Sequence, residues 1–262
     1  MSVVKILGVE IDQVTFDGAL THIEGFVEQR GTHQVVTVNP EFIMRAQHDT
    51  GFRQVLNDAD LAVADGAGLL WASRVIEKRH RQTTSHKSHI LPERVTGTDL
   101  VPALVARAAE AGWRVYFLGG GPGMATQTAE IFTKAYPNLK IAGAEMGPLV
   151  TADGKPLNAD QAALLEAVIS RIQHTKPDLL FVAFGAPKQD RFIARYRKEL
   201  KVPVMIGVGG AFEFISGKVR RAPAIFRALW LEWLWRLIME PWRAQRIWTA
   251  AVSFPLTVLR HK

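Results

Sequence analysis

The stretch RVYFLGGGPG, residues 114–123, decides the fold class of this 262-residue chain. Residues 115–118 are β-branched, aromatic or aliphatic, which predicts a buried strand. The glycines end that strand, and Pro122 suits the first turn of a helix that we expect to run to residue 136. A strand that turns tightly into a helix is the repeating unit of a parallel α/β sheet.

The same alternation extends over residues 1–217. Helical periodicity predicts helices between most of the strands, and the polar residues 77–94 predict a loop. We therefore expect one domain, an α/β fold with a Rossmann-like, mostly parallel sheet and helices on both faces. Apolar runs predict strands at residues 3–7, 34–38, 61–64, 114–118, 140–144, 179–184 and 203–208.

Residues 218–262 differ from the rest in charge and in tryptophan content. They carry nine basic and two acidic side chains, which account for the whole net charge of +7, and five of the seven tryptophans. Arginine pairs with lipid phosphate and indole rings favour the headgroup layer, so this mixture suits an anionic membrane surface. We expect a basic, Trp-rich helical appendage that contacts a membrane. The alternative is a helix pair buried against the preceding domain.

The composition also restricts the compartment. The chain has no cysteine, which excludes disulfides and thiolate metal sites and suits a reducing compartment. Glu10 and Asp12 precede any long apolar run, so we expect no signal peptide. Residues 228–239 are the longest apolar stretch, but Glu232 and Arg236 interrupt it and it is shorter than the roughly 20 residues that span a bilayer. These features predict a cytoplasmic protein, peripheral on the inner face of the cell membrane.

Asp65 is the sharpest single candidate for chemistry. In open α/β sheets ligands bind outside the carboxyl ends of the strands, and Asp65 follows the predicted strand 61–64 directly. Gly66 lets the backbone turn away, which leaves the carboxylate at the rim of the sheet as a possible general base. The alternative is structural, because Asp-Gly is also a common turn pair and aspartate a common helix N-cap.

The glycine turn at residues 119–123 is a candidate for binding phosphate. Helix N-termini favour anions, so Gly119, Gly120, Gly121 and Gly123 are expected to contact a diphosphate. The turn departs from the dinucleotide fingerprint G-x-G-x-x-G, because Met124 stands at the sixth position. A flexible strand-to-helix turn with no ligand is the alternative.

Two sets of residues could in principle bind a metal ion. Asp58 and Asp60 resemble a metal-binding acidic pair, but they precede a strand and so belong to the amino end of the sheet. His80, His86 and His89 fit no standard ligand spacing, and such histidines are more often solvated. We expect no metal site.

Taken together, these segments resemble the WecG/TagA/CpsF family of bacterial glycosyltransferases, over essentially the whole chain. One departure is Glu213, where the family more usually has aspartate. The resemblance is carried by Thr37-Val38-Asn39-Pro40-Glu41, Ala59-Asp60-Leu61, Asp65-Gly66-Ala67-Gly68, Arg94-Val95-Thr96-Gly97-Thr98-Asp99-Leu100, Phe117-Leu118-Gly119-Gly120, Pro122-Gly123, Gly185-Ala186-Pro187-Lys188-Gln189-Asp190, Gly207-Val208-Gly209-Gly210-Ala211-Phe212, Arg221-Ala222-Pro223, residues 231–237 and Glu240-Pro241.

The resemblance implies an inverting, metal-independent transferase with no cofactor. It would move an N-acetylmannosamine-type sugar, or a related hexose or uronic acid, from a UDP-sugar donor to undecaprenyl-diphosphate-linked N-acetylglucosamine. This reaction serves cell-surface polysaccharide or teichoic acid synthesis. It also implies a catalytic domain at residues 1–217 and an appendage at 218–262 that closes over the site. The implied general base is Asp65, and the implied substrate-binding residues are Thr37, Asn39, Arg94, Gln189, Arg221 and Arg227.

The residues alone leave two other functions open. An NAD-dependent oxidoreductase would use the glycine turn and Glu145 on a ribose. A non-enzymatic nucleic-acid-binding protein would use the basic tail, although the tryptophans favour lipid over nucleic acid. The sequence leaves the transferred sugar, the pathway and any homo-oligomer undetermined.

Overall fold

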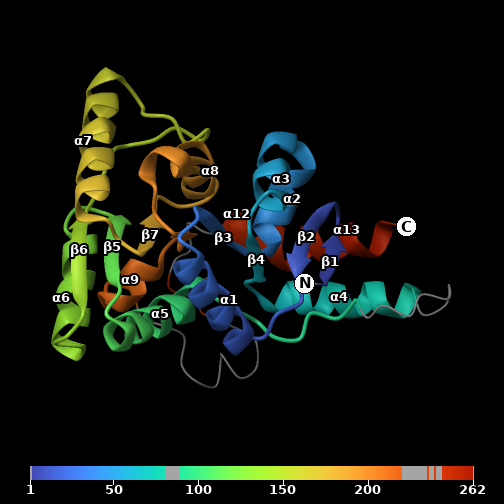
Figure 1. The fold of residues 1–262 in the computed structure, drawn as a ribbon. Helices are drawn as coiled ribbons and strands as arrows, with labels where there is room; N and C mark the ends of the chain where they lie inside the picture. Colours follow the sequence, from blue (N-terminus) through green and yellow to red (C-terminus); the bar gives the residue numbers. More distant parts are fainter. Residues whose placement is uncertain (1, 81–88, 220–234, 236–238, 240–243, 262) are drawn as a thin grey trace.

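The computed structural model of the protein describes residues 2–80, 89–219, 235, 239 and 244–261. Within these ranges, six strands form one sheet whose neighbouring strands are all parallel (Figure 1). The predicted α/β sheet is therefore confirmed. The strand order is β4 (Leu61–Ala64), β3 (His33–Val38), β8 (Val204–Gly207), β7 (Leu179–Ala183), β5 (Arg114–Gly119) and β6 (Lys140–Glu145).

Helices cover both faces of the sheet, so successive side chains of a strand enter different cores. Val35, Phe117 and Phe181 belong to one core, and Val36 and Leu118 belong to the cores on the opposite face. The first face is covered by α1 (Phe16–Gln29), α5 (Gly97–Ala111), α6 (Met124–Ala135) and α9 (Ala211–Ile215). The second is covered by α2 (Pro40–His48), α3 (Thr50–Asn57), α4 (Ala67–His80), α7 (Ala159–Thr175) and α8 (Lys188–Leu200).

The first predicted strand is half of a hairpin that lies outside the main sheet. β1 (Val3–Ile6) pairs antiparallel with β2 (Val9–Asp12) in a two-stranded sheet. The sequence analysis missed β2 because it predicted a single strand over residues 3–7. Leu7 and Gly8 both have positive φ, 49° and 85°, which is typical of the two-residue turn that joins twisted hairpin strands.

Helix α4 continues to His80, beyond residue 77 where the sequence predicted a loop to begin. That boundary was wrong because tertiary contacts hold the last turn of the helix. The buried carboxylate of Glu77 accepts a hydrogen bond from the backbone N–H of His89, with a distance of 2.7 Å. Arg79 binds a second helix, near the end of the chain.

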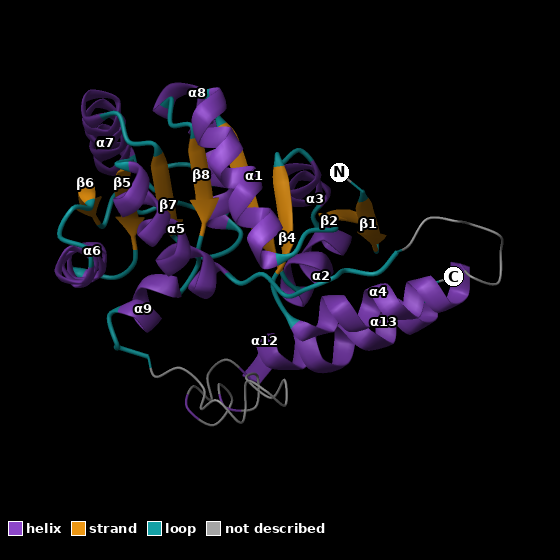
Figure 2. Cartoon of the chain, turned by 60° about the horizontal axis from the view of Figure 1, so that its bottom comes forward, coloured by secondary structure: helices purple, strands orange, loops and turns teal. Residues whose placement is uncertain are grey.

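The described part of the C-terminal tail packs on the body of the protein. It is a continuous helical segment made of α12 (Ala244–Trp248), a π-helical turn (Thr249–Ser253) and α13 (Phe254–Arg260). Phe254 and Val258 are buried in the core that α2 and α4 share. Figure 2 shows α13 lying beside α4. The boundary at residue 217 stays a prediction, because most of residues 220–243 lie outside the described ranges.

The guanidinium of Arg79, on α4, caps the carboxyl end of α13. It donates hydrogen bonds to the carbonyl oxygens of Val258, Leu259 and His261, at 3.0, 2.8 and 2.7 Å. These carbonyls have no partners within the helix, so a cation placed there satisfies them and favours the helix dipole. The two helices are thereby fixed to each other. Among the helices that the structure describes, none is both long and apolar enough to cross a bilayer.

Candidate active site

Asp65 lies at the carboxyl rim of the sheet, as predicted. It follows β4 directly, and its backbone N–H donates to the carbonyl oxygen of Val38 at the end of β3, at 2.7 Å. Its side chain is partly exposed rather than packed in the core. Gly66 has a φ of +128°, a conformation that favours glycine, and turns the chain into α4. Asp65 therefore lies at the rim of the sheet and outside its buried core.

Thr37 and Asn39 stand at the end of the neighbouring strand, β3. The buried hydroxyl of Thr37 donates to the carbonyl oxygen of Gly207 on β8, at 3.2 Å. The amide oxygen of Asn39 accepts the N–H of Phe42 at 3.0 Å and caps α2. The amide N–H groups of Asn39 can still donate to a ligand.

Residues 94–99 run along the same rim. Val95 donates to the carbonyl oxygen of Ala64 at 2.8 Å, which places Arg94 next to the chain at Asp65. Thr96 caps α5, accepting the N–H of Asp99 at 3.1 Å and donating to its carboxylate at 2.7 Å.

Gly97 brings the start of α5 against Thr37. A Cβ atom at Gly97 would lie 3.7 Å from the Thr37 methyl group and 3.5 Å from the Cα of Val208. The N-terminus of α5 therefore belongs to this site, which the sequence analysis did not predict. The signal that could have located it is the capping pattern of Thr96 and Asp99 at the start of a predicted helix.

Gln189 joins two loops of the rim. Its buried amide oxygen accepts the N–H of Gly185, after β7, at 3.1 Å and the N–H of Gly209, after β8, at 3.0 Å. The resemblance placed Gln189 among the substrate-binding residues. Its contacts support a role in holding these two loops beside the site.

The glycine turn lies at the same rim of the sheet as Asp65, but four strands away from it. Gly119 has a φ of +110°, and Gly120 donates to the carbonyl oxygen of Ala183 at 2.8 Å. The N-terminus of α6 has no side-chain cap. In the sheet, β5 and β4 are four strand spacings apart, which at about 4.8 Å per spacing separates their ends by about 19 Å. The predicted residues thus fall into two groups, one around Asp65 and one at the glycine turn.

We expect a Gly119→Ala variant to be destabilised by about 1–3 kcal/mol, because overpacking and positive φ both disfavour a side chain. A Cβ atom at Gly119 would lie 2.8 Å from the backbone of Ala183. Gly121→Ala is the control, since a Cβ there has its nearest neighbour at 3.7 Å. Thermal unfolding followed by circular dichroism compares the two, and equal transition temperatures would contradict the strain at Gly119.

Asp190 is a fully buried carboxyl group beneath this rim. Burial raises its pKa to about 7, and its own backbone N–H and the Gln189 side chain offset only part of that shift. Neither carboxyl oxygen has a hydrogen-bond partner with good geometry among the described residues. A Cβ atom at Gly207 would lie 2.5 Å from Oδ1, so Asp190 packs directly under the end of β8. The sequence predicted no role for this residue.

The raised pKa of Asp190 predicts a pH-dependent stability. The folded state keeps the proton that the unfolded state loses above the usual pKa of 3.8, so stability falls as pH rises from about 4 to about 7. Relative to the wild type, we expect Asp190→Asn to gain about 4 kcal/mol in stability between pH 4 and pH 8, because the asparagine side chain has no proton to lose. Urea unfolding between pH 4 and pH 8 measures the stability of both proteins. Asp160→Asn, which changes an exposed carboxylate, is the control. Parallel stability curves for wild type and Asp190→Asn would contradict the buried, neutral carboxyl.

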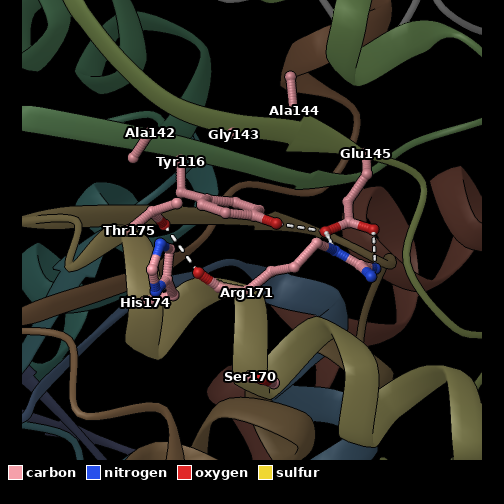
Figure 3. Close-up of a pocket in the computed structure, with 9 residues that line it drawn as sticks. All are labelled: Tyr116, Ala142, Gly143, Ala144, Glu145, Ser170, Arg171, His174 and Thr175. Atoms are coloured by element: carbon pink, nitrogen blue, oxygen red, sulfur yellow. Dashed lines mark hydrogen bonds and ion pairs between the residues drawn. The ribbon is translucent and has the colours of Figure 1, made fainter.

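A separate hollow of about 480 Å³ lies between β6 and α7, at the far edge of the sheet from Asp65 (Figure 3). In it Arg171 binds both carboxylate oxygens of Glu145, at 3.1 and 2.6 Å, and the hydroxyl of Tyr116 donates to one of them. Burial and this carboxylate raise the pKa of Tyr116. In the oxidoreductase alternative Glu145 would bind a ribose. In the structure its carboxylate is instead bonded to Arg171 and Tyr116.

The acidic pair before β4, Asp58 and Asp60, makes structural hydrogen bonds. Asp60 accepts hydrogen bonds from the N–H of Gln34 at 2.9 Å and from Arg197 at 3.2 Å, at the amino end of the sheet. Asp58 accepts a bond from Gln54. Among the residues with described positions, no group of three or more His, Asp or Glu side chains is arranged to hold a metal ion.

Two predicted substrate-binding residues, Arg221 and Arg227, lie outside the described residues. Lys218, a described cation of the same basic tail, lies at the glycine turn. A Cβ atom at Gly121 would lie 3.9 Å from Nζ of Lys218. The start of the basic tail therefore reaches the carboxyl rim.

Comparison with known proteins identifies the family of the chain. The profile described as "Glycosyl transferase WecG/TagA/CpsF family" matches residues 4–262. A protein of Bacillus spizizenii is 32% identical over 261 residues, which cover 96% of this chain and 91% of its own. A Bacillus subtilis protein is 32% identical over 237 residues, covering 90% and 83%. A Staphylococcus aureus protein is 31% identical over 246 residues, covering 93% and 87%.

All three relatives are named N-acetylglucosaminyldiphosphoundecaprenol N-acetyl-beta-D-mannosaminyltransferase. The family match spans nearly the whole chain, including the sheet and the C-terminal segment. The chain belongs to the WecG/TagA/CpsF family of glycosyl transferases.

Proposed function

We propose that this enzyme transfers an N-acetylmannosamine-type sugar from a UDP-linked donor to N-acetylglucosamine on undecaprenyl diphosphate, with inversion and without a metal ion. The names of the three relatives state this sugar and this acceptor. The observation that carries the proposal is the position of Asp65. Its partly exposed carboxylate stands at the rim between the end of β3 and residues 94–97.

In the proposed reaction, Asp65 acts as the general base. Its carboxylate accepts the proton of the acceptor's sugar hydroxyl while that oxygen bonds to the anomeric carbon of the donor. The bond from the same carbon to the UDP oxygen breaks on the opposite face, so the configuration inverts and UDP leaves with the electron pair. A positioned base of this kind contributes about 10²–10⁴ to the rate.

The leaving diphosphate needs positive charge and N–H donors close to Asp65, because it is bonded to the reacting carbon. Arg94, the amide of Asn39 and the first N–H groups of α5 lie at this part of the rim. The glycine turn is about 19 Å away, which suits the nucleoside end of an extended donor better than the reacting end. Arg221 and Arg227 stay proposed contacts of the diphosphate.

We also propose that residues 218–262 hold the enzyme on the inner face of the cell membrane. The support is the concentration of basic residues and tryptophans in this segment. An acceptor that carries an undecaprenyl chain is held in the membrane, so an enzyme bound to that surface meets it there. Nothing in the described residues requires a nucleic acid as partner.

A donor screen tests the proposed function. The purified chain is incubated with N-acetylglucosamine linked through diphosphate to a short polyprenyl chain and with UDP-linked N-acetylmannosamine, its uronic acid, N-acetylglucosamine or glucose. UDP release, product mass and the one-bond coupling between the anomeric carbon and its proton are measured, with and without EDTA. We expect turnover with an N-acetylmannosamine-type donor, an inverted linkage and no effect of EDTA. No turnover with any donor, or a retained configuration, would contradict the proposal.

A further inference from the structure

We propose that α4 forms part of the surface that binds an anionic lipid membrane, so that the body and the tail contact the membrane together. This rests on the proposed function, which places the acceptor in a membrane. It extends the contact from the tail to a helix that begins two residues after Asp65. The partner is a lipid surface with anionic headgroups.

Helix α4 carries one exposed face that is apolar and cationic. Trp71, Arg74 and Lys78 are exposed, and their spacing of three and four residues places them on one side of the helix. Trp71 is 37% exposed, although tryptophan is mostly buried in soluble proteins. Leu69 and Ala72 are buried on the opposite side. An exposed indole ring flanked by cations suits the headgroup layer.

The helical segment at the end of the chain exposes a second set of apolar side chains. Trp248 is 63% exposed, and Leu256 and Leu259 are also exposed, with Arg260 beside them in the sequence. Five of the nine exposed large apolar residues of the described structure lie on α4 or the tail. They are Trp71, Met239, Trp248, Leu256 and Leu259.

The two helices form one unit. Arg79 of α4 donates to the last carbonyls of α13, and Phe254 packs against α4 at Gly68, where a Cβ atom would lie 3.5 Å from its ring. Figures 1 and 2 both show α4 and α13 side by side. A surface that binds lipid through one helix therefore carries the other with it.

The charge of this surface selects the partner. Among residues 67–80 and 244–261 the single acidic side chain is Glu77, which is buried. The exposed charges are cations, including Arg74, Lys78 and Arg260. Each basic residue near an anionic bilayer adds roughly fivefold to binding. A protein partner of mixed charge would not need this one-sided composition.

The arrangement has a consequence for the reaction. Trp71 lies about 6 Å along α4 from the first residue of the helix, Ala67, at 1.5 Å per residue. Asp65 precedes Ala67 by two residues, so a membrane contact at Trp71 lies at the same end of α4 as Asp65. A sugar joined to a lipid by a diphosphate is held close to such a contact.

The test compares full-length variants in sedimentation with liposomes of phosphatidylcholine containing 30 mol% phosphatidylglycerol. We expect Trp71→Ser, and separately Arg74→Gln with Lys78→Gln, to lower binding by at least about fivefold. The matched controls are Leu157→Ser, an exposed apolar residue at 58%, and Lys134→Gln, an exposed lysine on α6. Circular dichroism and the unfolding temperature confirm that each variant is folded.

A second readout uses two acceptors. Transfer to a polyprenyl-linked acceptor in liposomes should fall with the binding, whereas transfer to a water-soluble short-chain acceptor should be unchanged. Unchanged liposome binding in folded Trp71→Ser and Arg74→Gln/Lys78→Gln would overturn the inference, as would equal binding of the wild type to pure phosphatidylcholine. Liposome binding is measured without substrates, so failure of the proposed reaction in the wild type is a separate outcome.

Discussion

We expect the Asp65→Asn variant to fold normally and to transfer sugar at least about 100-fold more slowly than the wild type. The substitution keeps the size of the side chain but removes the carboxylate that accepts the proton. Asp65 is partly exposed at the rim, so the loss of its charge leaves the core unchanged. The rate of UDP release with both substrates, measured at saturating donor, gives the effect.

The control for this variant is Asp160→Asn. Asp160 is an exposed carboxylate in the first turn of α7, away from the rim residues around Asp65. Its variant should retain the wild-type rate. Near-normal turnover in Asp65→Asn would remove this residue from the mechanism. A fall in the unfolding temperature of Asp65→Asn would instead support the alternative that it serves the turn into α4.

We expect Phe254→Ala to lower the free energy of unfolding by about 3–5 kcal/mol. Phe254 is fully buried, and its ring packs where α2 and α4 meet, next to Gly68. Removing the ring opens a cavity that the two helices close only in part. Urea unfolding measures the loss, with Leu256→Ala on the same helix as control. Leu256 is 46% exposed, so its variant should change stability by less than about 0.5 kcal/mol.

If Phe254→Ala and Leu256→Ala are equally stable, the tail is not part of the folding core. If the expected difference is found, deletion of residues 218–262 cannot isolate the membrane role. Such a deletion would remove buried side chains as well as the cationic surface. Point variants on the exposed side of α4 separate these two effects, because they leave Phe254 and Val258 in place.

Local patterns predicted the elements of the sheet well. The apolar runs that end at Val38, Ala64 and Leu118 became β3, β4 and β5, because a fully buried strand needs apolar side chains on both faces. The N-cap at Asn39 was also predictable, since its side chain bonds to a backbone N–H only three residues away. These features depend on neighbours in the sequence.

Long-range features were beyond such patterns. The end of α4 depends on contacts with His89 and α13. The hairpin strand β2 depends on the positive φ angles of Leu7 and Gly8 in its turn. The burial of Asp190 follows from where α8 crosses β8, so its raised pKa has no local signal. In each case the partner lies far along the chain or on a different element.

Patterns in the sequence were enough to predict the class of fold, the position of Asp65 at the end of a strand and the basic, tryptophan-rich character of the tail. Which strands are neighbours became known from the three-dimensional arrangement. It paired β3 with β4 and β8, which collects Asp65, Asn39 and residues 94–97 at one rim and leaves the glycine turn four strands away. It also set α13 against α4. The physical reason is that hydrophobic burial has no direction along the chain, so packing between distant segments chooses the partners that local propensity leaves open.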